Sequence, residues 1–327
     1  MASIRHRGNK WQARITRKGF PPEVKTFNTR KEAEQWARSA EADMDRGSFV
    51  SRSQAEANTL EDIIDRYITD VCPTQRGGTD AVIRLRATCR NTLAKLSMAA
   101  LTPKVLAAFR DERLKQVKPA TVIRDLAYLS AIINHARREW DINITNPVAL
   151  IRKPPTPQGR DRLLLADEED RLLAALAPTG RRSPWLRPMM ILSLETAMRR
   201  GELLQLRWSN INLENQTAFL PMTKNGTART VPLSRKAVDL LRELPRCIDG
   251  RVFPVNAPAH HAAFKRACKR AGLVDLHWHD LRHTAITRLA AKLPNLIELA
   301  AVSGHRNLAM LKRYYHPSAV ELAKKIG

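Results

Sequence analysis

A proline-rich stretch, NPVALIRKPPTPQGRD (residues 146–161), most constrains the fold, because it interrupts the helical periodicity found on both sides of it. Proline removes a backbone donor and disfavours helix in the residue before it, so no regular element is expected to continue through this stretch. A polar stretch, SRSQAEANT, reads as a second linker. The chain is therefore predicted to form three regions, at residues 1–50, 51–156 and 157–327.

In the first region, apolar and polar residues alternate as in a strand, and a stripe of apolar residues at helical spacing follows. Trp11, Ala13 and Ile15 alternate with Gln12, Arg14 and Thr16, as the two faces of a strand do. The VKTF stretch reads as another strand, and the TRKE stretch that follows is a capping box for a helix ending near Gly47. We expect a small sheet packed on one helix.

The two larger regions are predicted to be mainly helical. In the middle region one helix begins after Thr59, a second covers 81–93, a third follows Thr102 and a fourth begins near Thr121. The last region is helical to about Trp208, continues as short strands with an Asn-Gly hairpin signal at 225–226, and ends helical. The predicted fold class is therefore mainly α with small β-sheets, in several domains.

The charge of the chain predicts a polyanionic partner. The formal net charge is +24, and neutralising phosphates with Lys or Arg releases condensed counterions. The exposed strand face of the first region and the basic second helix of the middle region are the candidate DNA contacts, although each is also compatible with an ordinary solvated face. These candidates are Gln12, Arg14, Thr16, Arg84, Arg86 and Arg90. Neither a membrane span nor a secretory signal is found, so we expect a cytoplasmic protein.

The stretch HWHDLRHTAITRLA carries the densest group of chemically active side chains. His279, Arg282 and His283 share one helical face by their spacing. A guanidinium grouped with two imidazoles suits a phosphoryl group, since Arg offers a planar fork and imidazole moves protons near neutral pH. The alternative is a metal pair at His279 and His283, but Arg replaces the Glu of HExxH and a third ligand is not indicated.

Five motifs together resemble the tyrosine recombinase (phage integrase) family. In chain order they are TAMRRGELLQL, TKNG, HDLRHT, SGH and RYYH. The resemblance implies an N-terminal arm-type (AP2-like) DNA-binding domain, a helical core-binding domain and a catalytic domain. Two positions depart from the family pattern, with Ala197 in place of glycine and Ser303 in place of the leucine of LGH.

The resemblance also assigns roles to single residues. Arg199 and Arg282 correspond to the arginines that hold the phosphate, and Glu202 and His283 to supporting residues. Lys224 corresponds to the proton donor for the leaving oxygen, His279 to a proton-transfer group and His305 to a phosphate ligand. The RYxH pattern makes Tyr314 the nucleophile. If the chain is α-helical from Leu308, Tyr315 shares an apolar stripe with Leu311 and Tyr314 lies off it.

The implied reaction passes through a 3′-phosphotyrosyl intermediate and needs neither a metal nor another cofactor. The implied partners are double-stranded DNA at core and arm sites and three further copies of the chain in a tetramer joined by exchange of C-terminal tails. A directionality factor or DNA-bending protein is a further candidate partner. The implied biology is integration or excision of a phage or mobile element in a prokaryote. Two alternatives stay open, a DNA-binding protein that no longer cleaves and a metal-dependent nuclease.

Overall fold

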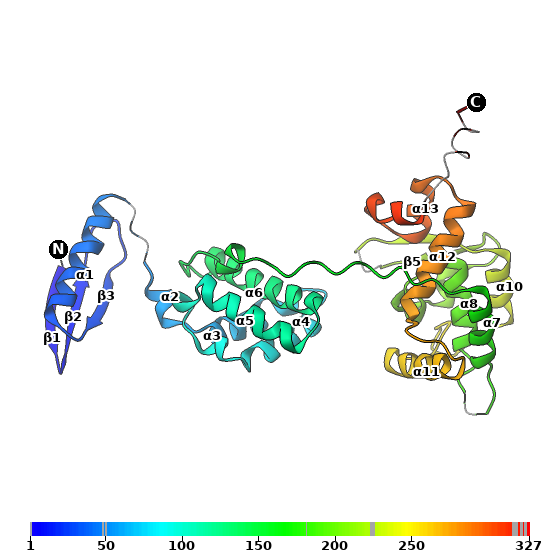
Figure 1. The fold of residues 1–327 in the computed structure, drawn as a ribbon, viewed down its shortest axis with the longest axis horizontal. Helices are drawn as coiled ribbons and strands as arrows, with labels where there is room; N and C mark the ends of the chain where they lie inside the picture. The colour runs from blue at the N-terminus through cyan, green and yellow to red at the C-terminus, as the bar shows by residue number, and fades with distance from the viewer. Residues whose placement is uncertain are drawn as a thin grey trace. The chain divides into compact units, whose positions relative to one another are not determined.

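The computed structural model describes residues 2–327 except 48, 50, 181, 223–225, 316–319, 321–322 and 324–325. Contacts between backbone positions divide the chain into two compact units, Met1–Gln158 and Gly159–Gly327 (Figure 1). Within the described residues, no helix is both long and apolar enough to cross a membrane. The predicted fold class is confirmed, because helices predominate and the sheets are small.

The first unit begins with a three-stranded antiparallel sheet packed on one helix. Ala13 and Ile15 are fully buried while Arg14 is exposed, which confirms the predicted alternation. The helix begins after Thr29, whose hydroxyl accepts from the backbone N–H of Glu32 while the Glu32 carboxylate accepts from the Thr29 N–H. The elements are β1 (Ala2–Arg7), β2 (Lys10–Ile15), β3 (Glu23–Phe27) and α1 (Arg30–Asp45).

The four helices predicted for the middle region are present. They are α3 (Leu60–Asp70), α4 (Gly78–Cys89), α5 (Pro103–Gln116) and α6 (Pro119–Glu139). The longest, α6, buries one complete stripe that includes Leu126, Ile132 and Ile133, each without exposed surface. This stripe closes one hydrophobic core with α3 and α4.

Three details of the middle region differ from the prediction. The second helix ends at Cys89 rather than near 93, because the Asn91 side chain accepts from the Leu93 N–H and starts a separate 3₁₀ turn. The polar stretch predicted as a linker contains helix α2 (Ser53–Ala57), anchored by the buried Ala55. The proline-rich stretch begins with a 3₁₀ turn whose Val148 is buried. The 3₁₀ turns are η1 (Cys72–Thr74), η2 (Thr92–Lys95), η3 (Met98–Ala100) and η4 (Pro147–Leu150).

The second unit is built around a central helix, α8 (Leu186–Thr196). Met189, Met190 and Leu192 are fully buried, and the helix packs on α10 and α12. A helix that is apolar on most sides is buried by its neighbours. The remaining helices are α7 (Ala166–Ala175), α9 (Arg200–Gln205), α10 (Arg235–Glu243), α11 (Ala257–Arg270), α12 (Trp278–Lys292) and α13 (Leu296–Ser303). The antiparallel sheet joins β4 (Ile211–Asn212), β5 (Thr217–Leu220) and β6 (Arg229–Pro232), and the turn η5 (Trp208–Asn210) precedes it.

The chain is not α-helical from Leu308, which was the condition for the packing argument about Tyr315. The chain forms two 3₁₀ turns, η6 (Leu308–Met310) and η7 (Lys312–Tyr314), with backbone bonds from Leu311 N to Leu308 O (2.9 Å) and from Tyr314 N to Leu311 O (2.9 Å). Because 3₁₀ turns have three residues per turn, Leu311 and Tyr314 share a face. Leu311 is fully buried and Tyr314 packs against the same cluster, so the packing argument made for Tyr315 fails.

A buried histidine of α11 makes stability depend on pH. His260 has no exposed surface, stands edge-on to Trp278 with ring centroids 4.2 Å apart, and neither ring nitrogen has a hydrogen-bond partner among the described residues. Burial lowers the pKa of His260 to about 4, and the positive charge of Arg200 acts in the same direction. His260 therefore stays neutral in the folded protein at pH values at which the same residue in the unfolded chain, with a pKa near 6.5, is protonated.

We expect the free energy of unfolding to fall as the pH drops from about 6.5 towards about 4, with roughly 2–3 kcal/mol of the loss due to His260, since one pKa unit corresponds to about 1.4 kcal/mol. Urea denaturation at pH 7.0 and 4.5 measures this loss. Between the two pH values, the free energy of unfolding of His260→Leu should fall by roughly 2–3 kcal/mol less than that of the wild type. An equal loss in wild type and variant would contradict the assignment.

Candidate active site

Arg282 lies at the centre of the candidate site, between two backbone corners, which are the turns at Ala197 and Gly304 that end α8 and α13. Arg282 lies on α12, is 3 % exposed, and donates from Nη1 to the carbonyl of Ala197 and from Nη2 to the carbonyl of Ser303 (2.6 Å). Ala197 precedes the loop that carries Arg199, and Ser303 precedes the loop that carries His305. One buried guanidinium thus joins three of the predicted motifs.

Both corners use left-handed backbone. Ala197 ends α8 with φ 52° and Gly304 ends α13 with φ 70°. The positive φ of Gly304 favours glycine, and a Cβ there would lie 2.4 Å from Nη1 of Arg229, so a larger residue would have to displace this guanidinium. Ala197 occupies the position where the family pattern has glycine, and the chain tolerates the left-handed conformation without it.

A second arginine, Arg229 on β6, was missed by the sequence analysis. It donates from Nη1 and Nη2 to the two carboxylate oxygens of Glu202, both at 2.9 Å. Arg199 donates from Nη1 to Glu202 Oε1 (2.8 Å) and from its backbone N–H to Oε2 (2.8 Å). One buried carboxylate therefore holds two guanidinium groups, and the cluster with Arg282 keeps a net positive charge.

Arg229 could not be found from motifs, because it stands alone on a short strand. Arg229 and Glu202 are 27 residues apart in the sequence, and they come into contact only because the hairpin turns the chain back. Its Nε is buried and has no hydrogen-bond partner among the described residues. Burial acts to raise the pKa of the Glu202 carboxyl, but Arg229 and Arg199 outweigh it and hold the pKa below its ordinary value.

His305 is oriented by the serine that replaces the family leucine. Ser303 Oγ lies 2.7 Å from His305 Nδ1 and 2.6 Å from the carbonyl oxygen of Leu299. Because the Ser303 hydroxyl donates to Leu299, its oxygen accepts from the Nδ1–H of His305, which leaves Nε2 as the atom that would take up a proton to bond a phosphate oxygen. Burial lowers the pKa of His305 to about 4, and Arg282 and Arg199 add to the effect, so this imidazole is neutral at pH 7.

Tyr314 meets an imidazole of α12. Its hydroxyl is in hydrogen-bond contact with Nδ1 of His283, and the two rings stack with centroids 5.8 Å apart. The ring of His279, which is exposed, stands edge-on to His283 at 4.9 Å. His283, named only as a supporting residue, is thus the imidazole at the phenol. The Arg313 guanidinium carbon lies 5.5 Å from the centre of the Tyr314 ring.

Burial and neighbouring positive charges shift the pKa values of Tyr314, His283 and Arg282. Burial raises the pKa of Tyr314, although the charges of Arg313 and Arg282 act to lower it. Burial also lowers the pKa of His283 to about 4, and His279 and Arg313 contribute. For Arg282 burial lowers the pKa to about 9, with Arg199 adding to the effect. An anion placed among these cations would offset all the repulsion at once.

The other predicted residues are placed less centrally. Lys224 lies outside the described residues, as does most of the C-terminal tail. Arg14, Thr16 and Arg90 are exposed, Gln12 and Arg84 are half-buried, and Arg86 pairs with Asp65 at 2.5 Å. In the described part of the chain, no three His, Cys, Asp or Glu side chains gather as a metal site requires.

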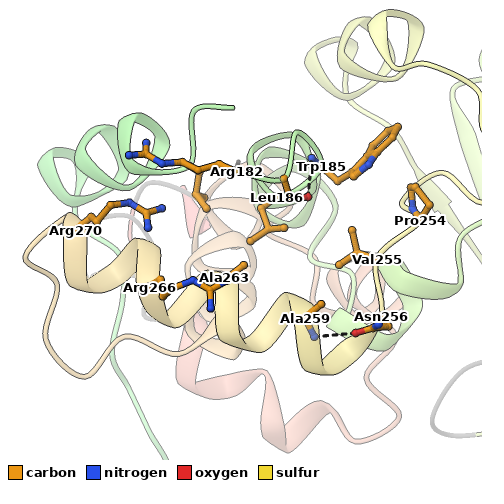
Figure 2. Close-up of a pocket in the computed structure, with 12 residues that line it drawn as sticks. Arg182, Trp185, Leu186, Pro254, Val255, Asn256, Ala259, Ala263, Arg266 and Arg270 are labelled. Carbon is orange, nitrogen blue, oxygen red and sulfur yellow. Dashed lines mark hydrogen bonds between the residues drawn. The ribbon is translucent and has the colours of Figure 1, made fainter. Parts of the chain in front are cut away.

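The second unit also has a cavity of about 370 Å³ between α11 and the start of α8 (Figure 2). Leu186, Val255 and Ala263 contribute apolar surface, and Arg182, Arg266 and Arg270 stand around it. None of the candidate site residues lines it. The site residues instead come from α9, α12, β6, the turn η7 and the loops that follow Ala197 and Ser303.

Comparisons with known proteins show the family and the fold of the chain. The sequence profile of the phage integrase family matches residues 162–321, and that of the phage integrase N-terminal domain matches residues 56–153. A shufflon-specific DNA recombinase of Escherichia coli is 40% identical over 277 residues, which cover 82% of this chain and 71% of the relative. The tyrosine recombinase XerC of Xanthomonas campestris pv. campestris is 28% identical over 294 residues, 84% of this chain and 85% of its own.

Solved structures show the same fold. A lambda integrase dimer bound to a COC′ core site superposes with a TM-score of 0.66 at 22% identity, covering 96% of this chain and 94% of that one. The integrase of the transposon Tn1549 gives 0.66 at 18% identity, covering 83% of this chain and 100% of that one. With these matches and the arginine, histidine and tyrosine cluster in place, the chain belongs to the phage integrase family and is a tyrosine-type site-specific recombinase.

Proposed function

We propose that this recombinase cleaves DNA with Tyr314 and holds the strand as a 3′-phosphotyrosyl ester. The observation that carries the proposal is a cationic cluster in which Arg199 and Arg229 share the Glu202 carboxylate and Arg282 bonds two backbone carbonyls beside them. His305 and Tyr314 lie at the edge of this cluster. Such a cluster suits the non-bridging oxygens of a phosphodiester, on which negative charge increases in the transition state.

In the proposed step the Tyr314 oxygen attacks the scissile phosphorus and the bond from phosphorus to the 5′ oxygen breaks. The phenol proton passes to His283 Nδ1, which is neutral at pH 7, with His279 in edge contact behind it. Lys224 supplies the proton that the departing 5′ oxygen takes up. The new ester keeps the energy of the phosphodiester, so attack by another 5′-hydroxyl rejoins the strands without ATP, metal or other cofactor.

The wider function is proposed from the relatives. Regions 1–50 and 51–156 would hold arm and core DNA sites, and region 157–327 would perform the chemistry. A lambda integrase tetramer bound to a Holliday junction has the same fold, with a TM-score of 0.67 at 22% identity. We propose a tetramer on DNA joined by C-terminal tails, acting on a phage or mobile element in a prokaryotic cytoplasm, with a directionality factor or DNA-bending protein as an additional partner.

The test is cleavage of a suicide duplex. The attachment site is found by mapping the junctions of the element that encodes the protein, and a nicked duplex of it is incubated with the protein in EDTA. We expect a covalent protein–DNA band on a denaturing gel that carries a label from the 3′-phosphate side of the break and leaves a free 5′-hydroxyl. Site-specific gel retardation without this band, or a band that appears only with added Mg²⁺, would overturn the proposal.

A further inference from the structure

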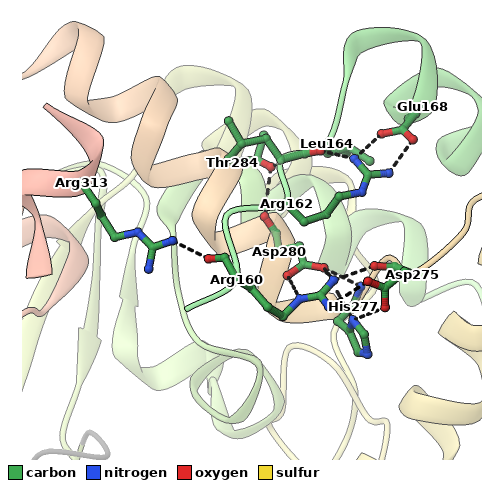
Figure 3. A network of polar contacts seen from close by, with 10 residues as sticks. Arg160, Arg162, Leu164, Glu168, Asp275, His277, Asp280, Thr284 and Arg313 are labelled. Carbon is green, nitrogen blue, oxygen red and sulfur yellow. Dashed lines mark hydrogen bonds and ion pairs between the residues drawn. The ribbon is translucent and has the colours of Figure 1, made fainter. Parts of the chain in front are cut away.

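The segment that leads into the second unit is fastened to the catalytic helix by one side chain (Figure 3). Arg160 donates from Nε and Nη2 to the two carboxylate oxygens of Asp280, at 3.1 and 2.9 Å. It also donates from Nη1 to the Asp275 carboxylate (3.0 Å) and from Nη2 to the Asp275 carbonyl (2.6 Å). The Asp280 carboxylate has no exposed surface, so this ion pair is anchored in the protein interior.

The same segment is tied a second time to α12. The Leu164 N–H donates to the Thr284 hydroxyl at 2.8 Å, one helical turn beyond Asp280. The arginine between the two ties, Arg162, pairs instead with Glu168 at 2.5 and 2.8 Å, near the start of α7. The segment 159–164 therefore has a fixed path along the helix that carries Arg282 and His283.

This fixed path ends against the arginine beside the candidate nucleophile. The carbonyl oxygen of Arg160 accepts a hydrogen bond from Nη2 of Arg313. A Cβ at Gly159 would lie 3.1 Å from Nη1 of Arg313, so the backbone of the segment closely approaches this guanidinium. Because Arg313 also lies over the Tyr314 ring, one side chain contacts both the incoming segment and the phenol.

We propose that Arg160 is a positioning residue for the cleavage reaction, acting through Arg313 on Tyr314. The Arg160 side chain fixes the segment, the Arg160 carbonyl fixes Arg313, and Arg313 holds the 3₁₀ turn that presents the phenol to His283. The segment continues from the proline-rich stretch that joins the two units. The inference rests on the proposed role of Tyr314.

The arrangement distinguishes this coupling from a simple charge effect. If Arg313 acted on Tyr314 only through its charge, Arg313→Lys would cleave at the wild-type rate. Replacing Arg160 would then have no effect on cleavage. The side chain of Arg160 donates hydrogen bonds to Asp275 and Asp280, and among the described residues it makes none to Tyr314. If removing the Arg160 side chain slows cleavage, the effect must therefore reach Tyr314 through a shift of the segment backbone or of α12.

The experiment measures single-turnover cleavage of the suicide duplex by full-length Arg160→Ala, Arg313→Ala and the double variant, with DNA affinity from gel retardation. Arg162→Ala is the matched control, because it removes an ion-paired arginine from the same segment without loosening either contact. We expect each single variant to cleave about 10- to 100-fold more slowly at unchanged affinity, since small misplacements of reacting groups cost rates of this order. The double variant should be no slower than the slower single one.

Cleavage by Arg160→Ala at the rate of the Arg162→Ala control would overturn the inference. So would multiplicative defects in the double variant, since Arg160 would then act by a route other than Arg313. If Arg160→Ala melts below the assay temperature, Arg160→Lys replaces it. Lysine keeps a cation against Asp280 but cannot span Asp275 as well, so a smaller loss in the same direction is expected and wild-type rates would refute it. Survival of the covalent band in Tyr314→Phe is a separate result, which refutes the proposed function itself.

Discussion

Replacing Tyr314 by phenylalanine is expected to abolish the covalent protein–DNA complex, whereas Tyr315→Phe retains it. Phenylalanine keeps the ring that packs on Leu311 but removes the oxygen that His283 contacts, so no ester can form. The suicide duplex in EDTA, resolved on a denaturing gel, measures the effect directly. Tyr315 is the matched control because it is also a half-buried tyrosine, one residue further along the chain.

Gel retardation should show that both tyrosine variants bind the site as the wild type does, because neither substitution alters charge. A band lost only in Tyr315→Phe would mean that the nucleophile had been assigned one residue too early. The contact between Tyr314 and His283 would then be packing only. A band present in all three proteins would point to another nucleophile altogether.

The second large effect is expected from Arg282→Lys. Lysine has one donor centre and cannot serve the carbonyls of Ala197 and Ser303 together while facing a phosphate. We expect cleavage to slow by about 10²–10³-fold, the usual cost of losing a preorganised donor. One buried carbonyl also loses its partner, so the free energy of unfolding should fall by about 1–3 kcal/mol in urea denaturation.

Arg288→Lys is the matched control for this substitution. Arg288 lies on the same helix, is 44% exposed and pairs with Glu169 at 2.5 Å. An exposed ion pair contributes little, so this variant should match the wild type in both measurements. If Arg282→Lys cleaved at the wild-type rate, the buried arginine would be a structural residue and the phosphate clamp would have to lie elsewhere.

Local signals predicted much of the fold. The capping boxes at Thr29 and Thr59 mark two helix starts, and the α6 stripe marks the longest helix of the first unit, because caps and periodicity act over a few residues. The motif order also selected Arg199, Arg282, His305 and Tyr314. These residues lie in or beside the cluster that the structure brings together.

Long-range pairing and turn type were not predictable in the same way. Arg229 meets Glu202 only because a hairpin returns the chain, and Arg160 meets Asp280 across 120 residues. No periodic pattern marks such single contacts. The two 3₁₀ turns at Leu308–Met310 and Lys312–Tyr314, which place the buried Leu311 and Tyr314 on one face, are not indicated by any spacing in the sequence.

The two corners that hold Arg282 are also the C-terminal ends of helices α8 and α13. The peptide dipoles of a helix place partial negative charge at that end, so two converging helices stabilise the buried cation, to which no carboxylate is hydrogen-bonded among the described residues. Dipoles lower the energy of the cation but do not cancel its unit charge. Arg199 and Arg229 share the Glu202 carboxylate, whereas Arg282 is hydrogen-bonded only to uncharged carbonyls and keeps its positive charge for an incoming phosphate.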